Sequence, residues 1–262
     1  MHTSSELGRH PDHMIALRKY GIEILEVPPT RGRYPDYLPN FMSGCMGLLS
    51  RHPGKAVVVT NADIVFSDPR HINNLLSSLG DNNFVLSHRF DIEAISGPPL
   101  AGVPYCYGFD FFAASSTVLE RSMNFLPSIL TFGLPWWDLY LPLAMVAAGA
   151  KPVLDCPNYY LHLLHHERWS VDYWYQIGSN ADAEFLRLSA KSTIDTQVFD
   201  WSLQRRLAIG IQFFSPKFFY KVMVRARDLI VNRKLRPLHL NDLANAIIDL
   251  ILANSIGINP NG

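Results

Sequence analysis

Two hydrophobic periodicities alternate along the first 155 residues of the chain. Continuous apolar or β-branched runs, which suit strands buried on both faces of a sheet, lie between stretches in which apolar residues recur at helical spacing. The expected strands are 22–27, 56–60, 83–88, 105–114 and 151–155, and the expected helices are 12–20, 38–51, 70–79 and 139–148. Because parallel neighbours require crossover connections, this alternation predicts a three-layer α/β/α fold with a mostly parallel sheet covered by helices on both faces.

The periodicity changes beyond about residue 181, where apolar residues recur at helical spacing almost to the end of the chain. The clearest helical stretches there are 213–231 and 238–252. We therefore expect an α/β domain over residues 1–178 and a helical C-terminal region over residues 179–262. A chain of 262 residues is long enough to bury the core that such a domain needs.

Composition excludes a disordered chain and several other classes of protein. Hydrophobic residues make up 48% and charged residues 18% of the chain, which suits a globular protein. Cys45, Cys106 and Cys156 have no paired or metal-like spacing, so neither a disulfide framework nor a zinc knuckle is indicated and a reducing compartment fits best. No segment resembles a signal peptide or a membrane-spanning helix. We therefore expect a cytoplasmic protein that is soluble or peripheral.

Charge is unevenly distributed although the formal net charge is zero. Residues 201–262 hold nine Lys or Arg and three Asp or Glu, so the rest of the chain is acidic to the same extent. Lys217, Lys221 and Arg225 recur every four residues beside several phenylalanines, as on a basic amphipathic helix. Residues 213–236 are thus a candidate contact with an anionic membrane surface, and the alternative is a helix packed on the α/β domain with its basic face in solvent. We expect no nucleic-acid partner.

Polar residues directly follow the β-branched strand 56–60. Asn61-Ala62-Asp63 lies at the end of that strand, where ligands of α/β sheets commonly bind. The carboxylate of Asp63, with an oxygen ligand from Asn61, can hold a hard divalent cation whose other ligands are substrate phosphates and water. The alternative is that Asp63 or Asn61 only caps the following turn.

Two further aspartates can carry chemistry. Asp138 follows Trp136 and Trp137 at the expected start of a helix, where capping and the helix dipole both favour a carboxylate, so the alternative to a catalytic role is a capping residue beside two core tryptophans. Asp110 lies in an otherwise aromatic strand, where an unpartnered carboxylate is costly to bury. It either binds hydroxyl groups of a ligand or pairs with an arginine such as Arg89.

A histidine cluster follows the expected strand 151–155. His162 and His165 are three residues apart, so on a strand or irregular segment they do not share a face and only one is expected to be a metal ligand. No Glu lies between helical histidines in the pattern His-Glu-X-X-His, which disfavours a zinc hydrolase.

Four stretches together resemble a little-characterised set of family 2-like, GT-A-type glycosyltransferases that use nucleotide-diphospho-sugars. They appear in the order and approximate spacing of that set, over about residues 56–170: Val58-Val59-Thr60-Asn61-Ala62-Asp63-Ile64, Gly108-Phe109-Asp110-Phe111-Phe112, Gly133-Leu134-Pro135-Trp136-Trp137-Asp138, and His162 with His165. The resemblance implies a three-layer α/β/α fold that binds a nucleotide sugar, usually with Mn²⁺ or Mg²⁺, and passes the sugar to an acceptor hydroxyl.

The resemblance also implies how the donor and metal are bound. Asn61-Ala62-Asp63 is similar to the family's Asp-X-Asp element, which bridges the metal to the donor diphosphate. His162, with His165 as second choice, is expected to complete the metal's protein ligands, and imidazole suits Mn²⁺ better than Mg²⁺. Asp110 is expected to help bind the donor.

The acceptor side follows from the third stretch. Asp138 is expected to act as the general base that deprotonates the acceptor hydroxyl, and Trp136 or Trp137 to offer a stacking surface for a sugar. The expected acceptor is a glycan or a lipid-linked glycan, as in the synthesis of envelope or surface glycans, presented on the cytoplasmic face of a membrane if residues 213–236 contact it.

Two departures from the family pattern keep other functions open. Asn61 replaces the first Asp of the Asp-X-Asp element, so the site should bind metal more weakly. The family's leading strand should precede the helix at 12–20, where only residues 1–8 are available, so this strand is either very short or truncated. The alternatives are a catalytically degenerate glycosyltransferase-like binding scaffold and a sugar-phosphate nucleotidyltransferase.

Overall fold

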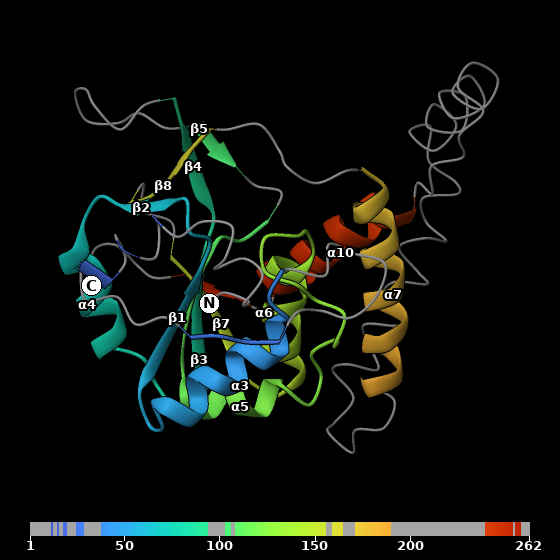
Figure 1. Ribbon diagram of the computed structural model, residues 1–262, viewed down its shortest axis with the longest axis horizontal. Helices are drawn as coiled ribbons and strands as arrows, with labels where there is room; N and C mark the ends of the chain where they lie inside the picture. The colour runs from blue at the N-terminus through green and yellow to red at the C-terminus, as the bar shows by residue number, and fades with distance from the viewer. Residues whose placement is uncertain are drawn as a thin grey trace.

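The computed structural model describes residues 38–93, 103–105, 108–155, 159–164, 171–189, 239–253 and 255–257, with residues 12, 15, 18, 19 and 25–28 before them. Its strands form two sheets (Figure 1). The five-stranded sheet has the order β1-β6-β3-β7-β9 and consists of β1 (Ala56–Thr60), β6 (Phe111–Ser115), β3 (Asn83–Ser87), β7 (Lys151–Leu154) and β9 (Ile256–Gly257). The four-stranded sheet has the order β2-β8-β4-β5 and consists of β2 (Ile64–Phe66), β8 (Tyr160–Leu163), β4 (Arg89–Ile92) and β5 (Val103–Tyr105).

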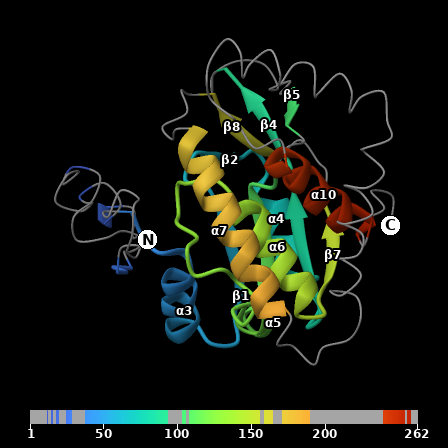
Figure 2. The same ribbon diagram turned by 90° about the vertical axis from the view of Figure 1, so that its right-hand side faces the viewer.

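Helices cover both faces of the five-stranded sheet (Figure 1, Figure 2). One face carries α4 (Pro69–Ser77), and the other carries α3 (Phe41–Arg51), α5 (Ser116–Ser122), α6 (Trp137–Ala147) and α10 (His239–Ala253). Outside α6 lies α7 (Val171–Ser189), the gold helix of both figures. The fold is therefore mixed α/β, as the alternating periodicities predict.

Strand direction differs from the predicted mostly parallel sheet. β3 is parallel to β7 and β7 is parallel to β9, but β6 lies between β1 and β3 and is antiparallel to both. The chain passes from β3 to β6 through β4 and β5, which belong to the second sheet, so β6 returns in the opposite direction. The prediction of a mostly parallel sheet is wrong in this respect, because hydrophobic periodicity does not encode strand direction.

Capping side chains set the starts of two of the helices that cover the five-stranded sheet. Asp68 accepts hydrogen bonds from the backbone N–H groups of Arg70, at 3.0 Å, and His71, at 3.3 Å, and Pro69 occupies the first turn of α4. Asn40 caps α3 in the same way, since its Oδ1 accepts from the backbone N–H of Ser43 at 2.9 Å. The helix predicted at 70–79 is confirmed as α4. The helix predicted at 38–51 is confirmed as α3, which begins at Phe41, three residues after the predicted start.

Two apolar cores flank the five-stranded sheet. The smaller one joins the sheet to α4, through Leu75 for example, and the larger one joins the opposite face to the other helices. Phe185 of α7 and Ile247 of α10 belong to the larger core together with strand residues. The predicted domain boundary between residues 178 and 179 falls inside α7, so in the described part of the chain the C-terminal helices share the core of the α/β domain.

Several predictions fall wholly or partly on residues outside the described ones. The predicted basic helix over 213–236 and the candidate ligand His165 lie there. Of the predicted helix at 12–20, residues 12, 15, 18 and 19 are described and are helical. Within the described residues, no helix has both the length and the apolarity needed to cross a bilayer.

Candidate functional site

The site begins where β1 ends and β6 starts. Thr60 pairs with Phe111, which brings Asn61 and Asp110 to the same edge of the sheet although they are 49 residues apart in sequence. The Thr60 hydroxyl donates to the carbonyl oxygen of Asp110 at 2.8 Å, and the Asn61 amide Nδ2 donates to the Asp110 carboxylate at 2.5 Å. Both the backbone and the side chain of Asp110 are thus fixed by the end of β1.

Asp110 is buried and paired with a guanidinium. Its exposed fraction is 3%, and Nη1 of Arg89 lies 3.3 Å and 3.2 Å from its two carboxylate oxygens. Burial raises the pKa of Asp110, while Arg89 and the Asn61 amide oppose that rise. The second reading of the sequence, in which Asp110 pairs with Arg89, is therefore confirmed.

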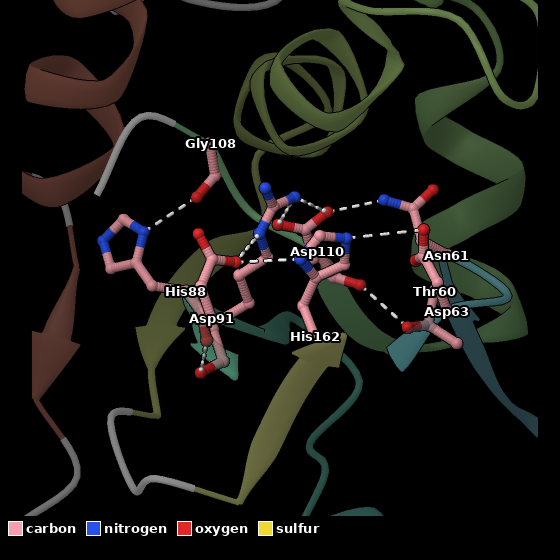
Figure 3. Close-up of polar contacts among 10 residues, drawn as sticks. Thr60, Asn61, Asp63, His88, Asp91, Gly108, Asp110 and His162 are labelled. Carbon is pink, nitrogen blue, oxygen red and sulfur yellow. Dashed lines mark hydrogen bonds and ion pairs between the residues drawn. The ribbon is translucent and has the colours of Figure 1, made fainter. Parts of the chain in front are cut away.

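Arg89 connects this pair to a second carboxylate. The Arg89 Nε donates to Oδ1 of Asp91 at 2.8 Å, and the guanidinium also stacks on the Tyr105 ring at 4.0 Å from its centroid. The same Asp91 oxygen lies 2.8 Å from Nδ1 of His162 (Figure 3). This contact follows from the register of β4 and β8, in which Asp91 is paired with His162.

His162 faces Asp63 with its other ring nitrogen. Nε2 of His162 lies 3.5 Å from Oδ2 of Asp63, and the neighbouring Ile64 pairs with His162 across β2 and β8. Because a carboxylate only accepts, the bond to Asp91 places a proton on Nδ1 and leaves the Nε2 lone pair facing the Asp63 oxygen. In this tautomer the Nε2 nitrogen and the Asp63 oxygen lie close enough together to ligate one cation.

The strand that carries His162 is tied to the main sheet by a separate group of side chains. The carboxylate of Asp155, at the end of β7, accepts from the Tyr160 hydroxyl at 2.5 Å and lies 2.7 Å from Nε2 of His71. Tyr160 and His162 are two residues apart on β8 and so project from the same face of the strand. Asp155 therefore helps to fix β8 relative to the five-stranded sheet.

Asp138 lies in the first turn of α6 and faces the loop before β6. A Cβ atom on Gly108 would lie 2.5 Å from Oδ2 of Asp138, so only glycine fits there without moving the carboxylate. The side chain is half-buried. Burial and the nearby Asp110 raise its pKa to about 7, against the opposing effects of nearby backbone N–H groups and Arg89. Asp138 can therefore exchange a proton close to neutral pH.

The two tryptophans before Asp138 are core residues in this structure. Trp136 is 0% and Trp137 is 2% exposed. The Trp137 ring packs against Phe41, with centroids 5.2 Å apart, and Phe112, at 5.8 Å. The structure thus corrects the expectation of an open stacking surface, because an acceptor sugar would reach either indole only after core side chains moved apart.

Asp91, His88 and Gly108 belong to the site but were not predicted as site residues from the sequence. Asp91 shares a strand face with Arg89 because they are two residues apart on β4, and this spacing was the available signal. His88 and Gly108 are joined by a 2.8 Å contact between His88 Nδ1 and the Gly108 carbonyl oxygen, which fixes the loop that faces Asp138 (Figure 3). No local sequence pattern predicts that contact.

The sequence-predicted residues Asn61, Asp63, Asp110 and His162 are thus gathered into one connected cluster (Figure 3). Among the described residues, no three His, Cys, Asp or Glu side chains form a complete metal-binding group. Comparisons with protein-family models, curated proteins and solved structures give no match for this chain.

Proposed function

We propose that this chain is a glycosyltransferase with a GT-A-like fold, which moves a sugar from a nucleotide-diphospho-sugar to an acceptor hydroxyl. The observation that carries the proposal is the contact between Asp63, which lies between β1 and β2, and His162 of β8, with Asp91 behind the imidazole. A metal-ligating histidine usually donates its second ring N–H to a carboxylate, as Nδ1 of His162 does here.

The charges of the cluster fit a divalent cation. Asp91 and Asp110 pair with the guanidinium of Arg89, and Asp63 lies beside His162, so these side chains carry two excess negative charges when His162 is neutral. Asp63 and His162 would hold Mn²⁺ or Mg²⁺, with diphosphate oxygens and water as the other ligands. When bound, the cation would neutralise charge that develops on the leaving nucleoside diphosphate.

Asn61 and Asp110 have different roles in this proposal. Because the Asn61 Nδ2 donates to Asp110, its carbonyl oxygen is oriented away and can accept a hydrogen bond from a donor hydroxyl. Both oxygens of Asp110 contact Arg89. Asp110 therefore orients Asn61 and Arg89 instead of binding the donor sugar directly.

Asp138 is the proposed general base. Its half-buried carboxylate and a pKa of about 7 allow it to accept a proton at neutral pH. In the transfer step the acceptor oxygen gives its proton to Asp138 and forms a bond to the anomeric carbon. The bond between that carbon and the diphosphate oxygen breaks, and its electron pair leaves with the nucleoside diphosphate.

A transfer assay tests the proposal. Purified protein is incubated with Mn²⁺, a panel of nucleotide sugars and glycan or lipid-linked acceptors, and release of nucleoside diphosphate is measured. Wild-type protein should release it, whereas Asp63→Ala should abolish release with its fold intact, as judged by circular dichroism. Asp81→Ala, at an exposed turn, is the matched control and should behave as wild type. Full activity in Asp63→Ala would reject the proposal.

A catalytically degenerate binding scaffold is the second candidate. Asn61 favours it, because an amide in place of the family's first carboxylate removes a negative charge from the metal site. Calorimetry with the same nucleotide sugars separates the two candidates. Binding with slow donor hydrolysis supports transfer, and no binding of any nucleotide sugar supports the scaffold.

A further inference from the structure

Trp136 has an unusual backbone conformation immediately before α6. Its φ is 86°, which makes it the one non-glycine residue with positive φ among those the structure describes. A bulky side chain is disfavoured in this left-handed region, so the conformation persists only where its surroundings hold it.

Helix α7 contacts the Trp136 indole at two points and holds it in place. The indole Nε1–H donates to the backbone carbonyl of Trp174 at 2.7 Å, and the two indole rings lie 4.4 Å apart between centroids. One helical turn later, a Cβ atom on Gly178 would lie 2.4 Å from Cζ2 and 2.5 Å from Cε2 of the same indole. Glycine in a helix interior is less favourable than alanine, so the close approach of the ring explains its presence.

Trp136 directly precedes α6, the helix that carries Asp138. The left-handed turn at Trp136 is followed by α6, which begins at Trp137 and places Asp138 in its first turn. The backbone N–H groups of Asp138 and Trp136 favour the ionised form of the Asp138 carboxyl. On its other side that carboxylate faces Gly108, and the charged groups that act on it are Asp110 and Arg89.

We propose that α7 positions the Asp138 carboxylate. It does so through two contacts with the Trp136 indole, the hydrogen bond to the Trp174 carbonyl and the close packing of the ring on Gly178. Gly178 and Trp136 are then positioning residues that never touch substrate. The indole fixes the turn, and the turn fixes where the carboxylate lies between Gly108 and the Asp110–Arg89 pair. An effect of these contacts on sugar transfer rests on the proposed function, but their effect on the position of the Asp138 carboxylate does not.

Titration of Asp138 tests the proposal without any activity. The full chain is labelled with ¹³C-aspartate, the Asp138 resonance is assigned from its loss in Asp138→Asn, and its pKa is followed by NMR. Gly178→Ala should lower the pKa of Asp138 by about one unit or more, because a displaced indole admits water to the first turn of α6. Ser179→Ala, at the exposed neighbouring position of α7, is the matched control and should leave the titration unchanged. A folded Gly178→Ala protein with an unchanged or raised Asp138 pKa overturns the proposal.

A second pair of variants covers the case in which Gly178→Ala does not fold. Trp136→Phe removes the N–H that reaches Trp174 and the ring edge that faces Gly178, so it should also lower the pKa of Asp138. Adding Gly178→Ala to Trp136→Phe should cause little further change, because the smaller ring leaves room for the methyl group. An unchanged Asp138 titration in Trp136→Phe overturns the proposal as well.

Failure of the positioning role of α7 can be distinguished from failure of the proposed function. If Asp138→Asn retains full transfer activity, the role of Asp138 as a base fails while the titration shifts still stand. If transfer depends on Asp138 but the titration is the same in Gly178→Ala and wild type, the function stands and the positioning role of α7 fails.

Discussion

Asp91 and His162 lie opposite each other on the parallel strands β4 and β8, with Oδ1 of Asp91 2.8 Å from Nδ1 of His162. This contact fixes which nitrogen of the imidazole carries a proton and aims the other at Asp63. It joins residues 71 positions apart in the sequence. The candidate metal site is therefore built by strand pairing as much as by the residues that would touch the cation.

Asp91→Asn should weaken Mn²⁺ binding. An amide in place of the carboxylate no longer selects the Nδ1–H tautomer with the same strength, and loss of such a partner typically lowers metal affinity by about 10-fold to 100-fold. Isothermal titration of Mn²⁺ into the wild-type and variant proteins measures the change. Asp81→Asn is the control, and equal affinities in wild type and Asp91→Asn would contradict the role of Asp91.

Asp138→Asn should flatten the pH dependence of stability. The folded pKa of about 7 lies above the ordinary value of 3.8, so ionisation of Asp138 destabilises the fold. The free-energy cost of ionising Asp138 in the fold is absent below about pH 4 and grows up to about pH 7. Above pH 7 it is at most about 4 kcal/mol, and solvent exposure of the half-buried side chain makes it smaller.

Urea unfolding at pH 5 and pH 8 measures this effect. Wild-type protein should lose more stability than Asp138→Asn between the two values, so the variant gains relative to wild type at pH 8. Parallel losses in the two proteins would show that Asp138 ionises in the fold without cost.

Gly108→Ala should impair transfer without unfolding the protein. The added methyl group would lie 2.5 Å from Oδ2 of Asp138, so the carboxylate must move. A displacement of about 1 Å at a catalytic group can lower the rate by about 100-fold. The turnover number and the melting temperature are measured together. A normal turnover number in Gly108→Ala would argue against Asp138 as the base.

Arg89→Met should destabilise the fold strongly. The change keeps much of the side-chain volume but leaves the Asp110 carboxylate, 3% exposed, without its cationic partner. Breaking a buried ion pair on one side typically costs about 3–5 kcal/mol. Denaturant unfolding measures the loss, and adding Asp110→Asn should restore part of it. Full stability of Arg89→Met alone would show that another group compensates Asp110.

The sequence alone was sufficient to locate strands 56–60, 83–88 and 151–155 and the aspartates near their ends, but not the second sheet, and the predicted strand 105–114 combines the end of β5 with most of β6. Strand 56–60 ends in Asn61 and Asp63 because the apolar run stops there, and ligands gather at such ends. The pairing of Asp110 with Arg89 was one of two readings, since a buried carboxylate needs a partner. These inferences depend on local patterns that a single sequence contains.

Other features depend on contacts between distant segments and could not be predicted. The direction of β6 is set by the passage of the chain through the second sheet, and the contact of Asp91 with His162 by the register of two distant strands. The burial of Trp136 depends on α7, which contacts it from about 40 residues further along the chain through Trp174 and Gly178. Hydrophobic periodicity reflects local structure only and therefore does not predict contacts between distant segments.

The most direct test of the proposed function is whether a cation joins Asp63 and His162 to a diphosphate. Calorimetric titrations with uridine, guanosine and thymidine diphosphates, with and without Mn²⁺, are carried out on wild type and Asp63→Ala. At least one nucleoside diphosphate should bind wild type about tenfold or more tightly with Mn²⁺ than without it, and Asp63→Ala should lose this dependence. Affinities that are the same with and without Mn²⁺ in wild type, or the same Mn²⁺ dependence in Asp63→Ala, would contradict it.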